Sequence, residues 1–166
     1  TSSIDTSVFD TPGSAIDVAI SGNFAFVTDE VNGLQVVDTS IQVAPPLVGS
    51  LEGSGNDVVI ADSMAYILSK WPGLTGIDIS SPANPMTCPS QKIGGYLTPF
   101  SMVSSGNYLF AATGFSLEIF DIKTAPCNIT QLSSVLYTGA VDGNVPSSAA
   151  VDGIAIDGNY AYVAAS

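Results

Sequence analysis

A short sequence pattern recurs four times along the chain, and this repeat constrains the fold more than any other feature. The pattern is an apolar run, a two-residue turn and a second apolar run, and it occupies residues 17–27, 57–67, 102–111 and 153–163. The turns of successive copies lie 40, 44 and 52 residues apart. A unit of this size cannot bury its apolar face alone, so we expect the copies to stack on one another.

A second pattern follows the first three copies. It is an apolar run that ends in aspartate, at residues 34–38, 74–78 and 117–121. Alternating runs of Val, Ile, Phe and Tyr, separated by Gly-Asn, Asn-Gly and Pro-Gly, predict strands joined by tight turns. In the first copy the expected strands, called a to d from the axis outward, are 15–20, 24–29, 34–38 and 47–51. Four antiparallel strands in about 40 residues make one β-propeller blade, so the predicted fold class is all-β.

Two stretches also carry a family resemblance. DVAISGNFAFVTDEVNGLQVVDTS, residues 17–40, and GIDISSPANP, residues 76–85, are similar to LVIVD repeats. Members of that family resemble propeller blades and occur largely in bacterial and archaeal surface or secreted proteins. The resemblance therefore implies a propeller in an extracellular or cell-surface protein, and it implies no active site. The third copy fits less well, because Gly114-Phe115-Ser116 shortens its second turn.

The repeat organises the whole chain as a single propeller or propeller segment. Residues 1–14 are expected to hold strand d of a preceding or closing blade, because residues 4–9 align with a fourth strand. We expect about four blades, of which the last stops after its second strand. The expected limits are 15–54 for blade 1, 55–100 for blade 2, 101–149 for blade 3 and 150–166 for the partial blade 4.

The partial blade predicts an unpaired strand edge, which a protein has to cover or blunt. Three arrangements would cover it: further blades in a longer chain, a ring that closes with an incomplete blade, or pairing with another copy by strand addition. The last arrangement gives a homo-oligomer or polymer, and the apolar outer residues 135–137 favour it. The start at Thr1, without methionine or leader, indicates a processed protein or an excised fragment.

Composition excludes several classes of function. The chain has three lysines, neither arginine nor histidine, and 15 acidic residues. The net charge of −12 repels nucleic acid, so no nucleic-acid partner is expected. A Ser-His-Asp or Cys-His site needs an imidazole, so we do not expect an enzyme. No apolar run reaches the length of a membrane span.

The two cysteines, Cys88 and Cys127, fall in equivalent loops between strands c and d of blades 2 and 3. Equivalent loops of adjacent blades are neighbours on one propeller face, so we favour a disulfide over two buried thiols. Asn128 begins the pattern Asn-Ile-Thr and is a candidate for N-glycosylation. A low-charge composition rich in Ser, Thr and Gly also fits an extracellular location.

Four residues are candidates for ligand binding. Lys70 and Trp71 lie in a turn of blade 2, and Asp142 and Asn144 lie in the long loop before blade 4. Both segments map to one propeller face, where Trp71 either contacts a sugar or a protein, or packs between blades. The acidic loop also raises calcium as a cofactor, but its spacing does not match an EF-hand, so no metal site and no cofactor are expected.

The aspartates that end the third strands, Asp38, Asp78 and Asp121, share one repeat position. A ring of carboxylates is a candidate cation site. However, an aspartate that leaves a strand normally binds the backbone that follows it. We therefore expect these three residues to be structural.

The sequence thus predicts a non-catalytic, extracellular structural or interaction module that self-assembles through strand addition, as a surface or filament subunit. The alternative is a glycan- or protein-binding propeller, similar to a lectin, that uses the face with Trp71. A propeller glycoside hydrolase or lyase is less favoured. It would need two carboxylates that face the axis, for which Asp17, Asp57 and Asp142 are the candidates.

Overall fold

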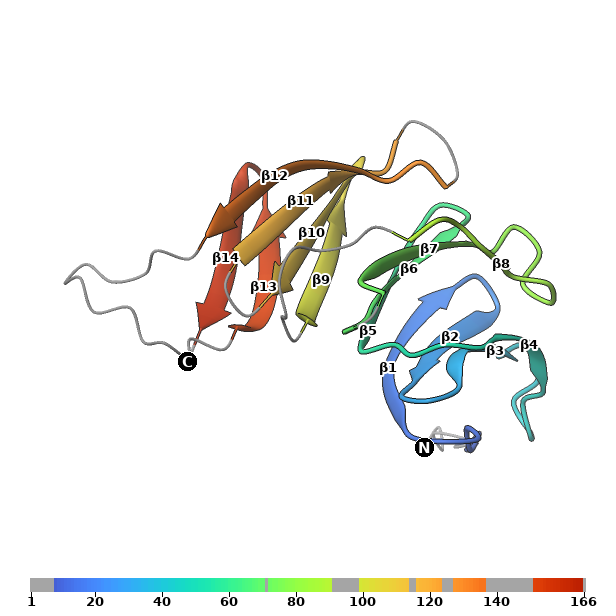
Figure 1. The fold of residues 1–166 in the computed structure, drawn as a ribbon. Helices are drawn as coiled ribbons and strands as arrows, with labels where there is room; N and C mark the ends of the chain where they lie inside the picture. The colour runs from blue at the N-terminus through green and yellow to red at the C-terminus, as the bar shows by residue number, and fades with distance from the viewer. Residues whose placement is uncertain are drawn as a thin grey trace, which may run out of the picture.

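The regular structure of the protein consists of β-strands in blade-like antiparallel sheets (Figure 1). The structure is a computed structural model that describes residues 8–70, 72–90, 99–113, 116–123, 127–136 and 151–165. In these residues three sheets have four strands and the last has two, which confirms the predicted all-β class and the incomplete fourth blade. The described residues contain no helix with the length and apolar character to span a bilayer.

Each sheet follows the chain in simple order, from the inner strand outward. Blade 1 consists of β1 (Ala15–Ser21), β2 (Phe24–Asp29), β3 (Gly33–Asp38) and β4 (Leu47–Leu51). Blade 2 consists of β5 (Asp57–Ala61), β6 (Met64–Leu68), β7 (Leu74–Asp78) and the short β8 (Met86–Thr87). Blade 3 consists of β9 (Pro99–Ser105), β10 (Tyr108–Thr113), β11 (Ser116–Asp121) and β12 (Thr130–Leu136). The hairpin of blade 4 is β13 (Val151–Asp157) and β14 (Tyr160–Ala165).

The hairpins between the first two strands depend on a backbone conformation that favours glycine. Gly22, Gly106 and Gly158 have φ angles of 56°, 56° and 55°. The second copy places Asp62 at the same turn position with φ 52°, a conformation that aspartate tolerates better than most residues. The predicted Gly-Asn turns are therefore confirmed. The expected strand at residues 4–9 lies mostly outside the described residues, and Val8 and Phe9 are not in a strand.

The inner strands β1, β5, β9 and β13 lie side by side, so that the sheets follow one another along an arc (Figure 1). Apolar side chains are buried between blades 1 and 2 and between blades 2 and 3. One buried cluster lies between blades 1 and 2 and includes Phe26 and Leu34 from blade 1 with Val58 and Ile67 from blade 2. The hydrophobic core is therefore a series of inter-blade layers.

Each blade has two faces, because side chains alternate along a strand. We call the face toward the preceding blade the leading face, and the face toward the next blade the following face. On the following face of blade 1, Ala19 pairs with Phe26 and Phe26 with Val36. The leading face of blade 2 carries Val58, which pairs with Ile67. These residues belong to the cluster that joins the two blades.

A disulfide joins Cys88, which follows β8, to Cys127, which precedes β12. The two Cα atoms are 4.9 Å apart, and Cys88 is buried in the cluster between blades 2 and 3. The predicted pairing is therefore present. Because the bridge connects neighbouring blades across 39 positions of sequence, it supplements the apolar layer between them.

We expect the double variant Cys88→Ala with Cys127→Ala to lower the free energy of unfolding by about 3 to 4 kcal/mol, since a bridge that closes a loop of this length restricts the unfolded chain. Urea unfolding of the variant and of the wild type under oxidising conditions measures the difference. Reduced wild-type protein serves as the control and is expected to resemble the variant. Equal stability of oxidised wild type and variant would contradict this role of the bridge.

Candidate functional site

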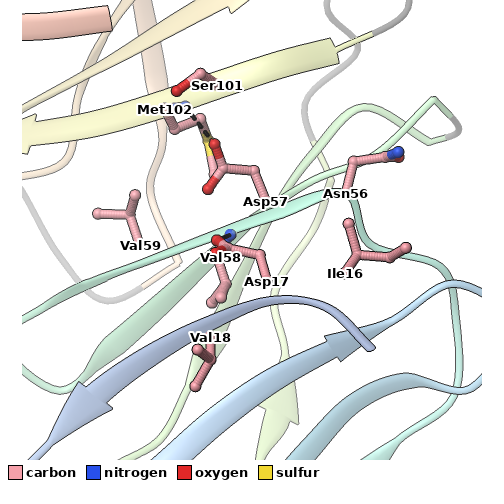
Figure 2. A pocket seen from close by; sticks show the side chains of 9 residues that line it. All are labelled: Ile16, Asp17, Val18, Asn56, Asp57, Val58, Val59, Ser101 and Met102. Carbon is pink, nitrogen blue, oxygen red and sulfur yellow. Dashed lines mark hydrogen bonds between the residues drawn. The ribbon is translucent and has the colours of Figure 1, made fainter. Parts of the chain in front are cut away.

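An open groove of about 510 Å³ crosses the beginnings of the inner strands β1, β5 and β9 (Figure 2). Its lining combines apolar residues of the strands with the side chains of Asp17, Asn56, Asp57 and Ser101. The two aspartates occupy the same repeat position in consecutive blades. The groove therefore brings together two of the three carboxylates that the sequence named as candidates for catalysis, and Asp142 lies outside the described residues.

Each of these aspartates binds the backbone of the next blade. Asp17 Oδ2 accepts a hydrogen bond of 2.9 Å from the N–H of Val58, and Asp57 Oδ2 accepts one of 2.6 Å from the N–H of Met102 (Figure 2). The register of β1 against β2 shifts between Ala15 and Asp17, and such a bulge changes the direction of a side chain. Hydrogen bonds to a carboxylate are stronger than neutral ones, so these bonds tie blade 1 to blade 2 and blade 2 to blade 3.

The two carboxyl groups also bind each other. Burial raises the pKa of Asp57 from its ordinary value of 3.8 to about 7, together with the hydrogen bond to Asp17 and the negative charge of that residue. The N–H of Met102 opposes this shift, because it favours the ionised form of Asp57. A proton held by Asp57 therefore allows the two acidic side chains to lie in contact.

This geometry does not suit glycoside hydrolysis. Retaining glycosidases hold their two carboxyl groups about 5 to 5.5 Å apart, and inverting enzymes hold them about 6.5 to 9.5 Å apart. A hydrogen bond to Asp17 helps to raise the pKa of Asp57, so the two carboxyl groups lie closer together than in either class of glycosidase. One oxygen of each is already occupied by a backbone N–H. The pair therefore joins blades, and its spacing differs from that of a glycosidase pair.

The later blades do not continue this arrangement. Ser101 stands at the equivalent position of blade 3 and Gly153 at that of blade 4. The register of β13 shifts between Val151 and Gly153, as that of β1 does between Ala15 and Asp17. Blade 4 therefore keeps the bulge of the repeat but has no carboxylate at this position.

The aspartates that end the third strands bind the following backbone, as the sequence predicted. Their Oδ1 atoms accept N–H groups of Ser40, Ser80 and Lys123 at 2.9, 2.9 and 2.8 Å, for Asp38, Asp78 and Asp121 respectively. The side-chain and backbone hydrogen bonds from Ser40 hold the pKa of Asp38 below its ordinary value. Among the residues that the structure describes, no group of three or more acidic, cysteine or histidine side chains could hold a metal ion.

Sequence reasoning missed Glu118, a buried carboxylate on β11. Its oxygens accept hydrogen bonds from Ser116 on the same strand and from Gln131 and Ser134 on β12. Three donors thus satisfy this side chain and tie the two outer strands of blade 3 together. The sequence offered one signal, an acidic residue within the apolar run at residues 117–121.

The remaining candidates are only partly placed. Lys70 is exposed in the turn after β6, whereas Trp71, Asp142 and Asn144 lie outside the described residues. The glycan- or protein-binding face therefore stays a prediction. Asn128 is exposed and follows Cys127 directly, so its side chain is accessible beside the bridge, and its glycosylation stays a prediction too.

The stacked sheets and the aspartate bonds between them define a repeat module of the β-propeller class. The family model of the LVIVD repeat matches residues 12–52, 52–90 and 149–166, which is more than half of the chain. The chain belongs to the LVIVD repeat family. The third copy, which fitted the pattern least well, is not among the matched segments. None of the curated proteins compared with the chain matches its sequence.

Several solved structures share the fold. The computationally designed Ika4 protein has a TM-score of 0.69 at 12% identity, over 99% of this chain and 93% of that chain. The designed Ika8 protein has a TM-score of 0.63 at 13% identity, over 92% of this chain but 43% of that chain. A functionally unknown protein from Desulfotomaculum acetoxidans DSM 771 has a TM-score of 0.52 at 18% identity, over 94% and 64% of the two chains. At these identities the similarity shows the fold alone.

We expect Asp57→Asn to make the protein more stable at about pH 8, by at least about 1 kcal/mol. An amide can accept the N–H of Met102 and donate to Asp17 without a charge. Because the folded protein raises the pKa of Asp57 to about 7, the stability due to its proton is complete below about pH 4 and is lost as the pH rises to about 7. Urea unfolding of both proteins between about pH 4.5 and pH 8 measures this slope, which is the change in the free energy of unfolding with pH.

A matched control is Asp78→Ala, which removes an aspartate whose pKa is held below its ordinary value by hydrogen bonds from Ser80. This variant is expected to lose stability over the whole range and to keep the wild-type slope between about pH 4.5 and pH 8. If the free energy of unfolding of Asp57→Asn changed with pH as that of the wild type does, Asp57 would not hold a proton in this range.

Proposed function

We propose that this chain is a non-catalytic, extracellular structural module that self-associates by strand addition at the free edge of β14. Membership of the LVIVD repeat family, which is not known as enzymatic, supports a non-catalytic role. The observation that carries the proposal is the edge of blade 4. Strand β14 pairs with β13 and, in the described part of the chain, with no other strand, whereas β2, β6 and β10 pair on both sides.

The free edge presents backbone groups in the arrangement that the other blades use for pairing. The carbonyls of Asn23, Ser63 and Asn107 accept N–H groups from beyond the third strand of their blades, at 2.7, 2.9 and 2.9 Å. Asn159 is the equivalent residue of blade 4. Since alternate residues of an antiparallel strand turn to opposite neighbours, Ala161 and Val163 direct their N–H and C=O groups to the same edge.

Nothing in the side chains of β14 blunts this edge. Natural edge strands avoid pairing with other chains by means of charged residues, proline or bulges. The sequence of β14 is Tyr-Ala-Tyr-Val-Ala-Ala, which has no charge and no proline. The outer strand β12 also exposes apolar side chains, Leu132 and Val135, so a second copy offers a suitable strand for pairing.

The acidic side chains support a structural role. Asp17 and Asp57 join blades, the strand-ending aspartates bind their own loops, and Glu118 is held by three donors. The disulfide and the exposed Asn128 support a location outside the cell, where bridges persist and glycosylation acceptors are modified.

We expect the wild-type chain to form oligomers or polymers and Ala161→Pro to be monomeric, because proline removes an N–H that points to the free edge. Proline is tolerated at such edge positions, so the hairpin is expected to fold. Light scattering coupled to size-exclusion chromatography measures the mass, and circular dichroism checks the fold. Ala161→Val, which keeps the N–H, is the control and is expected to assemble. A monomeric wild type, or equal assembly of Ala161→Pro, would overturn the proposal.

A further inference from the structure

The two ends of the blade series expose apolar side chains, and two of these positions, those of Tyr162 and Val18, are buried between blades 1 and 2 and between blades 2 and 3. On the following face of blade 4, Tyr160 is 70% exposed and Tyr162 is 57% exposed. On the leading face of blade 1, Val18 is 55% exposed and Ile20 is 63% exposed. Exposed apolar faces of this kind mark sites of interaction with other proteins.

The repeat identifies the environment that each of these side chains has in the other blades. Tyr162 pairs with Ala155 as Phe26 pairs with Ala19. Phe26, at the position of Tyr162, is 1% exposed, and Tyr66, at the same position of blade 2, is 3% exposed. Because Tyr66 is buried at this position, a tyrosine side chain fits there.

The other face follows the same rule. Val58 and Met102 occupy the position of Val18 in blades 2 and 3 and are 4% and 6% exposed. Phe26 and Val58 lie in one buried cluster, and Tyr66 and Met102 lie in the other. The position of Tyr162 thus lies in one buried cluster with the position of Val18 between blades 1 and 2 and between blades 2 and 3. The two end faces are the complementary halves of an interface that the chain already makes.

We infer that the following face of blade 4 packs on the leading face of blade 1 in a second copy of this chain, with Tyr160 and Tyr162 against Val18 and Ile20. The first and last blades stand apart in Figure 1, so the two faces do not meet in the part of the chain that the structure describes. This inference rests on the proposed self-association and names its partner. Because the two faces differ, the contact is head to tail, and it gives a ring if the rotation closes and a filament if it does not.

The inferred interface lacks one component of the internal ones. Between blades 1 and 2 and between blades 2 and 3, an aspartate binds the N–H of the residue at the position of Val18. Blade 4 has Gly153 at the position of that aspartate, and a Cβ atom there would meet nothing within 4 Å. The contact between copies therefore lacks a bond that the first two contacts between blades have, and an aspartate at position 153 would supply it.

The test uses charges placed on one face at a time. We expect Tyr162→Lys and Val18→Lys each to remain monomeric, because a lysine at either position would be buried in the interface. Both positions are exposed in the single chain, so both variants are expected to fold. An equimolar mixture of the two is expected to form a dimer, since Tyr162→Lys keeps an intact blade 1 face and Val18→Lys keeps an intact blade 4 face. Val43→Lys, at a residue that is 79% exposed on a loop, is the control and is expected to assemble as the wild type does.

A second variant tests the interface by strengthening it. We expect Gly153→Asp to tighten association by about tenfold or more, the effect of one additional hydrogen bond to a charged group, and Gly153→Ala to have no such effect. Analytical ultracentrifugation measures both dissociation constants. If the wild type assembles but the lysine variants assemble equally well, or if their mixture stays monomeric, the inference is wrong and strand addition alone stands. If the wild type is monomeric, the proposed function fails as well.

Discussion

The structure depends on the packing of each blade's following face against the leading face of the next blade. A single four-stranded sheet of this size has two apolar faces and can cover neither alone. Phe26 of blade 1 and Tyr66 of blade 2 are buried only because the next sheet supplies Val58 or Met102. The same requirement explains why blade 4, with two strands, still packs on blade 3, and why the faces at both ends of the series remain apolar.

Acidic residues reinforce this packing in a chain with few cations. Asp17 and Asp57 bind backbone N–H groups of the following blade and bind each other, so three inner strands are joined without a lysine or arginine. An N–H donor carries no net charge and is available on every strand. In the sequence, the acidic composition mainly excluded a nucleic-acid partner. In the structure, two of the acidic residues also hold neighbouring blades together.

The repeat made most of the fold predictable. Turn glycines, alternating runs and strand-ending aspartates are local signals, and they placed the strands of blade 1 and the role of Asp38 correctly. The repeat also put Asp17 and Asp57 at one position, but their mutual contact depends on the spacing and tilt of neighbouring sheets. Glu118 was missed for the same kind of reason, since its partners Gln131 and Ser134 lie on another strand. Contacts between different strands and sheets depend on how these elements pack, and the repeat pattern of the sequence does not indicate that packing.

The bridge between Cys88 and Cys127 also determines how the molecule would respond to tension applied at its two ends. Blades that contact only their neighbours can detach one after another, beginning with the two-stranded blade 4. The bridge spans 39 positions of sequence, and it would keep the chain between the two cysteines from extending even after blades 2 and 3 had separated. A chain of this kind would lengthen in steps under tension, and the disulfide would still limit its full extension.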